Sequence, residues 1–282
     1  MSNLIKRTLS GIVFVAVLLG SLCNELSFVI LFTLISALAI WEFCTLLNRH
    51  EHIQINRLVT TVSGAYLSLS ITLFNVQAAP LTIFAPYLLM LIYLLTAELY
   101  LKQPSPISNW AFSFAAQLYI ALPLALIQVL AFKCESDFIS THITFRPEFP
   151  LALLVFLWIN DTGAYLCGST LQKYCPYKLF PRISPNKSWI GSIGGAVLVS
   201  ISSCIFSYYS PLLSPIQWFG FGLVVVVFGT WGDLVESLLK RQLGVKDSGN
   251  FLPGHGGVLD RFDSLILATP AVIIYLSLLH QL

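Results

Sequence analysis

Residues 27–47 read SFVILFTLISALAIWEFCTLL, an apolar run whose only charged residue is Glu42. A membrane helix needs about 20 apolar residues to cross the roughly 30 Å hydrocarbon core of a bilayer. This stretch is long enough, and the same length criterion finds eight more spans in the sequence. The nine expected spans lie at about 9–23, 27–47, 58–74, 81–97, 109–132, 149–168, 189–209, 216–232 and 264–281. The sequence therefore predicts an all-α polytopic membrane protein with about nine transmembrane helices.

The composition excludes other classes of protein. Of 282 residues, 56% are hydrophobic and 10% are charged, whereas about 25% are charged in an ordinary soluble domain. A disordered chain would need low hydrophobicity and high charge. A nucleic-acid-binding protein would need a surplus of basic residues, but the net charge here is only +2. We therefore expect the lipid bilayer as a partner, and we do not expect the protein to bind nucleic acid.

The first expected span has an alternative interpretation as a secretory signal peptide. Lys6 and Arg7 precede its apolar run, as in the basic start of such a peptide. No A-x-A-like cleavage site follows, so we interpret residues 9–23 as a retained helix.

The basic residues predict the orientation of the chain in the membrane. Nine spans place the N-terminus and the segments 48–57, 98–108, 169–188 and 233–263 on one side. That side carries 13 of the 15 basic residues, and the other side has only Lys133 and Arg146. Because cytoplasmic loops are enriched in Lys and Arg, we expect a cytoplasmic N-terminus. We expect residues 1–150 to supply packing helices and dimer contacts. Residues 151–282 would form a catalytic transmembrane region with cytoplasmic loops 169–188 and 233–263.

Segment 233–263 holds most of the expected chemistry. Up to residue 241 its polar residues recur at helical spacing, and a second helix is expected to begin near residue 260 after a Gly-rich loop. If the two helices are antiparallel, their carboxylates approach each other and suit Mg²⁺ with substrate phosphate, while the bases hold phosphate. A solvated loop that obeys the positive-inside rule is the alternative, but it leaves five acids unexplained. The segment carries nine of the 28 charged residues: Asp233, Glu236, Lys240, Arg241, Lys246, Asp247, Asp260, Arg261 and Asp263.

A second cluster lies in and after span 149–168. Asn160 and Asp161 interrupt this apolar span, and an acid inside a membrane indicates function unless it pairs with a neighbouring helix for packing. Ser184, Lys187 and Ser188 precede the next span and are candidates for binding phosphate near a helix start. The glycines of the Gly191-x-x-x-Gly195 motif predict close helix packing. Glu42 and Glu98 lie at span ends, where snorkelling or simple pairing is sufficient to explain them.

The ordered motifs of the C-terminal half resemble the signature of the phosphatidate cytidylyltransferases (CDP-diacylglycerol synthases). They are Ser237-x-x-Lys240-Arg241, Lys246-Asp247-x-Gly249 and Leu252-Pro253-Gly254-His255-Gly256-Gly257-x-x-Asp260-Arg261-x-Asp263. The Asn160-Asp161 pair, Ser184-Pro185-x-Lys187-Ser188-Trp189 and Trp41-Glu42-Phe43 also resemble this family. One departure is Ile190, where family members commonly carry an acid.

The resemblance implies transfer of a cytidylyl group from CTP to phosphatidic acid, which gives CDP-diacylglycerol and pyrophosphate in phospholipid biosynthesis. It implies Mg²⁺, with K⁺ as a second cation, held by Asp233 and Asp260. It further implies a homodimer in a bacterial inner membrane with the active site facing the cytoplasm. The implied catalytic residues are Lys240, Arg241, Lys246, Asp247, His255, Arg261 and Asp263. The implied substrate-binding residues are Asn160, Asp161, Ser184, Lys187, Ser188 and Ser237.

Two other functions remain open at this point. One is a different CTP- or CDP-using lipid enzyme, either a lipid kinase or a CDP-alcohol phosphotransferase. The latter requires a D-G-x-x-A-R run, which Asp233-Leu234 and Asp260-Arg261 do not match. The other is a transporter, for which we find no paired interruptions in corresponding halves of the chain.

Overall fold

The structure, a computed structural model, describes residues 3–50, 52–136, 141–249, 251 and 256–281. The chain forms two compact units. The first comprises Met1–Pro147 with Asp247–Phe262, and the second comprises Glu148–Lys246 with Asp263–Leu282. The Gly-rich signature loop therefore belongs to the unit that contains the N-terminal helices.

Eight membrane-length apolar helices occur in the described part of the chain, and they correspond to the expected spans from 27–47 onward. The first expected span is also helical, but its apolar part, Thr8–Ser21, is shorter than the others. The prediction of an all-α integral membrane protein is confirmed.

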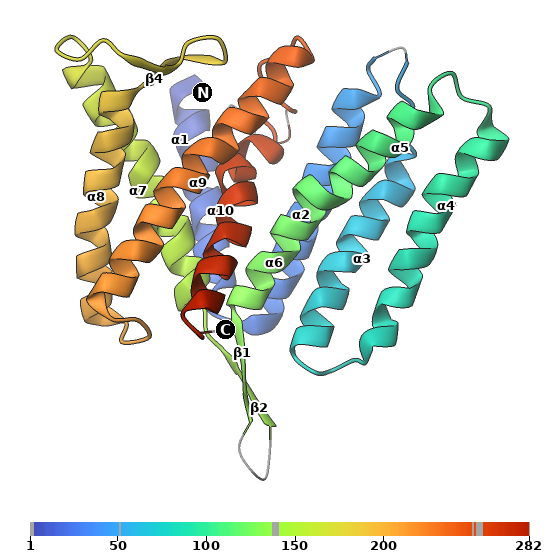
Figure 1. Cartoon of the computed structure of the whole chain (residues 1–282), viewed down its shortest axis with the longest axis horizontal. Coiled ribbons are helices and arrows are strands. Elements are labelled where there is room, and N and C mark those ends of the chain that lie inside the picture. Colours follow the sequence, from blue (N-terminus) through green and yellow to red (C-terminus); the bar gives the residue numbers. More distant parts are fainter. Residues whose placement is uncertain (1–2, 51, 137–140, 250, 252–255, 282) are drawn as a thin grey trace. The chain divides into compact units, whose positions relative to one another are not determined.

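In the first unit, the helices follow one another along the chain and are joined by short connections (Figure 1). Asn24 starts α2, because its Oδ1 accepts the backbone N–H of Leu26 at 3.0 Å and of Ser27 at 3.3 Å. A π-helical turn interrupts the expected span 109–132. The elements are α1 (Asn3–Ser21), α2 (Glu25–Leu47), α3 (Arg57–Asn75), the 3-10 turn Leu81–Phe84, α4 (Ala85–Leu101), α5 (Pro106–Ala115), the π turn Ala116–Ala121 and α6 (Leu122–Leu130).

A buried polar network joins α2, α3 and α6 within the first unit. The Gln128 amide donates to Ser68 Oγ at 2.5 Å and to Thr33 Oγ1 at 3.5 Å. Its Oε1 accepts the hydroxyl of Thr72. Neutral side chains that bond across helices stabilise membrane bundles. By contrast, only 6% of the residues in the most apolar part of Leu81–Leu101 are buried. Helix α4 therefore faces lipid at the edge of this unit.

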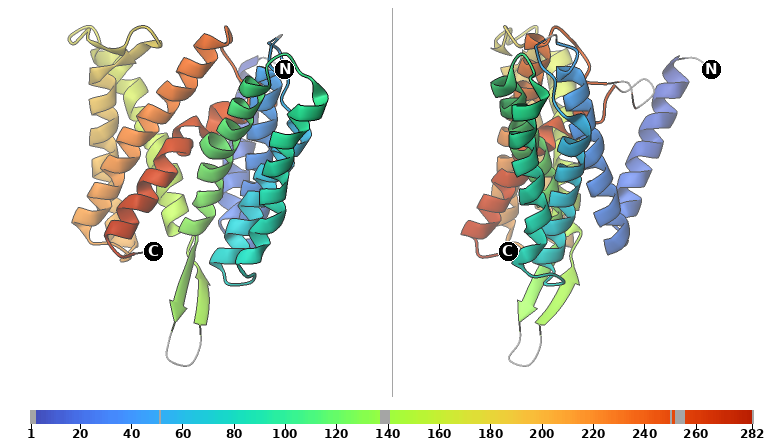
Figure 2. Two further views of the ribbon diagram at one scale, coloured as in Figure 1. Left: turned by 45° about the vertical axis from the view of Figure 1, so that its right-hand side comes forward. Right: turned by 90° about the vertical axis from the view of Figure 1, so that its right-hand side faces the viewer.

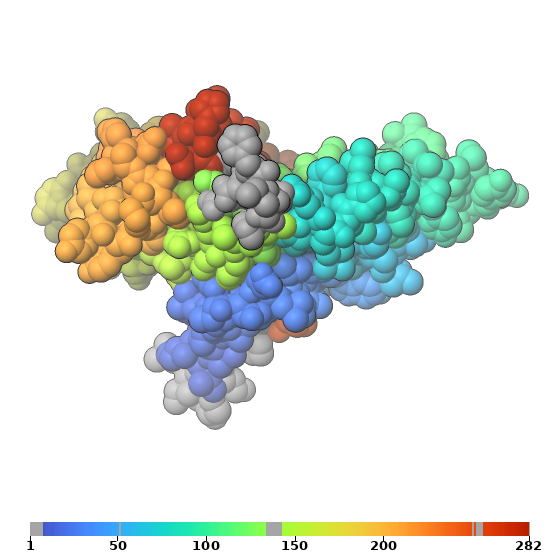
Figure 3. Space-filling view, turned by 90° about the horizontal axis from the view of Figure 1, so that it is seen from below, coloured from blue at the N-terminus to red at the C-terminus, as the bar shows by residue number. Residues whose placement is uncertain are grey.

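The second unit contains α7 (Glu148–Leu171), α8 (Trp189–Tyr209), α9 (Pro215–Gln242) and most of α10 (Leu259–Leu278). Small residues bring α7 against α8, since a Cβ atom added at Gly163 would lie 2.9 Å from the Gly195 Cα. This contact confirms the close packing expected for the Gly-x-x-x-Gly motif. Figure 3 shows the molecule from below the view of Figure 1. The α8–α9 connection (orange) forms part of this surface, at the end of the unit away from β4.

Two short hairpins were missed by the sequence analysis. β1 (Phe132–Ser136) pairs with β2 (Thr141–Phe145), and this hairpin extends away from the end of α6 (Figure 2). β3 (Lys178–Phe180) pairs with β4 (Ser184–Ser188) inside the expected loop 169–188. Strands of three to five residues carry too little alternation of polar and apolar residues to be recognised. The second hairpin delivers Lys187 and Ser188 to the start of α8.

Candidate functional site

A cavity of about 260 Å³ lies in the second unit and is lined by α7, β4, the start of α8, and α9. Five of the residues predicted for the site line this cavity, although they are spread over more than seventy positions of the sequence. They are Asn160, Asp161, Lys187, Ser188 and Asp233. The structure thus brings together the Asn160-Asp161 cluster and the first acid of segment 233–263.

Helix α7 presents two polar side chains to the cavity. Asp161 is exposed, whereas Asn160 is buried. The Oδ1 atom of Asn160 has no hydrogen-bond partner among the described residues. A Cβ atom at Gly195 would lie 2.5 Å from that oxygen, so the glycine makes room for it. A buried acceptor that lacks a partner is energetically costly.

Asp233 on α9 has two side-chain partners beside the cavity. Lys187 Nζ lies 2.5 Å from its Oδ2, and Ser237 donates its hydroxyl to Oδ1 at 3.1 Å. The side chains of Lys187 and Asp233 are 26% and 31% exposed. Because water reaches this ion pair, the lysine is free to exchange its carboxylate partner for a phosphate group at little cost.

Asp263 on α10 belongs to the same group of charges. A Cβ atom at Gly232 would lie 2.5 Å from the backbone oxygen of Asp263, so α9 and α10 meet closely beside Asp233. The Asp263 carboxylate interacts electrostatically with Asp161, Asp233 and Lys240. The second unit thus places the Asp233 and Asp263 carboxylates near each other, a pairing that the sequence analysis did not propose.

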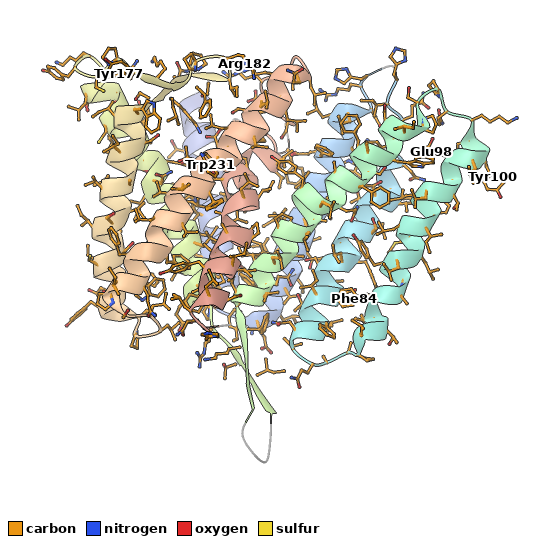
Figure 4. All side chains as sticks on the ribbon, in the orientation of Figure 1. Phe84, Glu98, Tyr100, Tyr177, Arg182 and Trp231 are labelled. Atoms are coloured by element: carbon orange, nitrogen blue, oxygen red, sulfur yellow. The ribbon has the colours of Figure 1, made fainter. Side chains whose placement is uncertain are left out.

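The start of α8 faces the cavity. Ser188 caps this helix, because its Oγ accepts the Gly191 N–H at 3.2 Å, and Gly191 and Ser192 also line the cavity. The Trp189 N–H donates to the Tyr177 carbonyl at 3.1 Å, so the first turn of α8 favours an anion mainly through its helix dipole. Ser184 lies in β4 opposite Phe180 and does not line the cavity. In Figure 4, Tyr177 and Arg182 lie at the same end of this unit, and Trp231 lies on α9 at a lower level, away from that end.

The last turns of α9 carry the next predicted bases. Lys240 forms an ion pair with Glu236, whose side chain is fully buried. Arg241 and Lys246 are exposed. Glu236 is not among the residues predicted for the site, although its spacing of four residues from Lys240 is typical of a helical ion pair.

Asp260 lies in the first unit and holds the signature loop. Its carboxylate accepts the N–H of Ser248 at 2.9 Å and of Gly257 at 2.8 Å. Gly256 adopts φ +83°, a conformation that favours glycine. The N–H groups of Ser248 and Gly257 thus bind an anion, which is a carboxylate of the protein itself. Asp247 and Arg261 are exposed in this unit, and His255 lies outside the described residues.

Glu42 is the residue of this region whose importance the sequence analysis missed. Its Oε2 accepts the backbone N–H of Leu259 at 2.9 Å and the hydroxyl of Ser248 at 3.3 Å. Snorkelling therefore does not describe it. The available signal was a single carboxylate inside the apolar run 27–47, since an acid within a membrane span is expensive.

The donor chemistry of the site suits a hard cation. Mg²⁺ prefers oxygen ligands and takes one or two carboxylates together with water and phosphate oxygens. Asp233 and Asp263 offer such oxygens beside a cavity. Within the described residues, no group of three or more His, Cys, Asp or Glu side chains is arranged to hold a metal by itself. Asp233 and Asp260 belong to different units, so their joint metal site stays a prediction.

Comparison with known proteins agrees with the motifs. The family model described as "Cytidylyltransferase family" matches residues 5–279. The phosphatidate cytidylyltransferase of Haemophilus influenzae is 32% identical, over 94% of this chain and 96% of that protein. The enzyme of the same name from Bacillus subtilis is 48% identical over 125 residues, which cover 44% of this chain and 45% of the relative. The chain belongs to the cytidylyltransferase family.

Proposed function

We propose that the protein transfers a cytidylyl group from CTP to phosphatidic acid and releases pyrophosphate. The family gives the reaction class, and the relatives named phosphatidate cytidylyltransferase suggest the lipid substrate. The observation that carries the proposal is the cavity that gathers Asp161 and Asp233 of two apolar helices with Lys187 of strand β4. A site with both signs of charge at the end of membrane helices suits a charged head group and a nucleotide triphosphate.

In the proposed reaction, a phosphate oxygen of phosphatidic acid attacks the α-phosphorus of CTP. The bond from this phosphorus to the bridging oxygen breaks, and pyrophosphate leaves. The protein contributes positioning and charge, because phosphoryl-type transfers need little covalent chemistry from the enzyme. Lys187 exchanges its ion pair with Asp233 for a phosphate oxygen. The helix dipole at the N-terminus of α8 favours the same anion.

The remaining groups have proposed supporting roles. The Oδ1 atom of Asn160 accepts a hydrogen bond from a substrate hydroxyl or amino group. The exposed bases Arg241, Lys246 and Arg261 bind triphosphate oxygens. Mg²⁺, with K⁺ as the second cation, would be held by Asp233 and Asp260 and would neutralise phosphate charge.

The cellular setting is also proposed. The excess of Lys and Arg on the side of the N-terminus supports an active site on the cytoplasmic face, where CTP is available. The bacterial origin of the relatives supports the inner membrane. A homodimer is proposed from the family resemblance alone.

The decisive experiment uses purified protein in mixed micelles with Mg²⁺, phosphatidic acid and CTP labelled at either the α- or the γ-phosphate. We expect the α-label in a CDP-lipid and the γ-label in pyrophosphate. Transfer of the γ-label to lipid would instead identify a lipid kinase. The Asp260→Asn variant should lose most of the rate, and full retention would contradict the role of Asp260. Phosphatidic acid flux across liposomes without product would identify a transporter.

A further inference from the structure

We propose that Glu42 is a positioning residue for the cytidylyl transfer, because it holds the signature loop in its working conformation. This inference rests on the proposed function. Glu42 lies near the end of α2, more than two hundred residues before the loop in the sequence. Glu42 and the loop both belong to the first unit. The contacts of Glu42 join the residues at the two ends of the loop, Ser248 and Leu259.

The Glu42 carboxylate reaches the two ends of the loop at once. Leu259, the first residue of α10, donates its backbone N–H to Oε2 at 2.9 Å. Ser248, at the other end of the loop, donates its hydroxyl to the same oxygen at 3.3 Å. The carboxylate thus caps α10 from a different helix, as an N-cap side chain normally does from its own chain segment.

The Glu42 carboxylate occupies the space that a side chain would need at two glycines of the signature. A Cβ atom at Gly249 would lie 2.6 Å from Glu42 Oε1 and 2.9 Å from its Cδ. A Cβ atom at Gly257 would lie 2.5 Å from Glu42 Oε2. At Gly249 the three nearest atoms all belong to Glu42, and φ is not in the left-handed region. The requirement for glycine at position 249 is therefore set by the Glu42 side chain.

Glu42 and Asp260 act on the loop together. Asp260 accepts the Ser248 N–H, while Glu42 accepts the Ser248 hydroxyl and the Leu259 N–H. Asp260 and Arg261 directly follow Leu259 on the first turn of α10. Loss of the Glu42 contact would therefore displace two groups proposed to bind metal and phosphate. Small displacements of positioned groups reduce transfer rates strongly.

The first test compares Glu42→Ala with Glu42→Gln in the full-length protein, using the α-labelled CTP assay. We expect Glu42→Ala to lower kcat about tenfold or more. The KM for CTP and the KM for phosphatidic acid should change less. Glu42→Gln keeps an oxygen that can accept the Leu259 N–H, so it should restore most of the rate. Glu98→Gln is the matched control, because Glu98 is a half-buried acid of the same unit that bonds Asn109 (Figure 4). It should leave kcat unchanged.

A second measurement separates positioning from general loss of folding. Hydrogen exchange should become faster at the amides of Ser248, Gly257 and Leu259 in Glu42→Ala, while α2 and α3 stay protected. Faster exchange throughout the unit, with kcat lowered equally by Glu98→Gln, would overturn the inference.

A double-mutant cycle with Gly249→Ala gives the sharpest test. The three atoms nearest to the added methyl group all belong to Glu42, so Gly249→Ala should lower the rate about fivefold or more in the wild-type background and little in Glu42→Ala. Additive effects would overturn the inference. A wild-type protein that forms no CDP-lipid would instead refute the proposed function, and active wild type with an active Glu42→Ala variant would refute only the role of Glu42.

Discussion

Polar residues of the membrane helices play different parts in the two units. In the first unit, Gln128 bonds to Ser68 and Thr72, and these buried neutral groups satisfy one another. In the second unit, Asp161 of α7 and Asp233 of α9 are charged and line a cavity, which Lys187 of strand β4 also lines. Both sets interrupt apolar sequence, but only the second leaves charge accessible to a ligand. A polar residue in a membrane helix therefore indicates a functional site when its surroundings leave it accessible, and helix packing when neutral partners enclose it.

The largest effect is expected at the charged cavity. Asp233→Asn should lower the rate of CDP-lipid formation about a hundredfold or more, because it removes a charge that the proposed metal requires. The radiolabel assay on protein with an unchanged gel-filtration profile measures this loss. A rate within threefold of wild type would mean that the cavity is not the site of transfer.

An intermediate effect is expected where α7 and α8 meet. Gly163→Ala places a methyl group 2.9 Å from the Gly195 Cα and should lower the free energy of unfolding by about 1–3 kcal/mol. Thermal unfolding in detergent measures the change. Gly20→Ala is the matched control, since nothing lies within 4 Å of its Cβ position. Equal unfolding temperatures for the two variants would contradict the packing described for α7 and α8.

The smallest effect is expected in the neutral network of the first unit. Gln128→Leu should lower the free energy of unfolding by about 1 kcal/mol, because hydrogen bonds between membrane helices are individually weak. The rate per folded molecule should remain that of wild type. If Gln128→Leu abolished transfer while the protein stayed folded, the contrast between the two units would fail.

Most of the fold follows from patterns local in the sequence. Apolar length located the spans, and helical spacing correctly extended α9 beyond residue 232 to Gln242. Local pattern also identified Asp161, because a charge stands out in apolar sequence, and Lys187, because it lies just before the start of a helix. The contact of α9 with Asp263 was not predictable, since it depends on the approach that Gly232 allows. The link from Glu42 to Leu259 joins distant parts of the chain, and no periodicity reports such a contact.

The length of α9 has a consequence for substrate binding. Its 28 residues extend about 42 Å, more than the roughly 30 Å of a bilayer core. Asp233, Ser237 and Lys240 therefore lie on a continuous helix whose backbone is already ordered before any substrate arrives. Fixing a flexible loop residue would cost about 1–2 kcal/mol of conformational entropy. Substrate binding at this helix needs to immobilise side chains only, so more of the contact energy remains for discrimination between nucleotides.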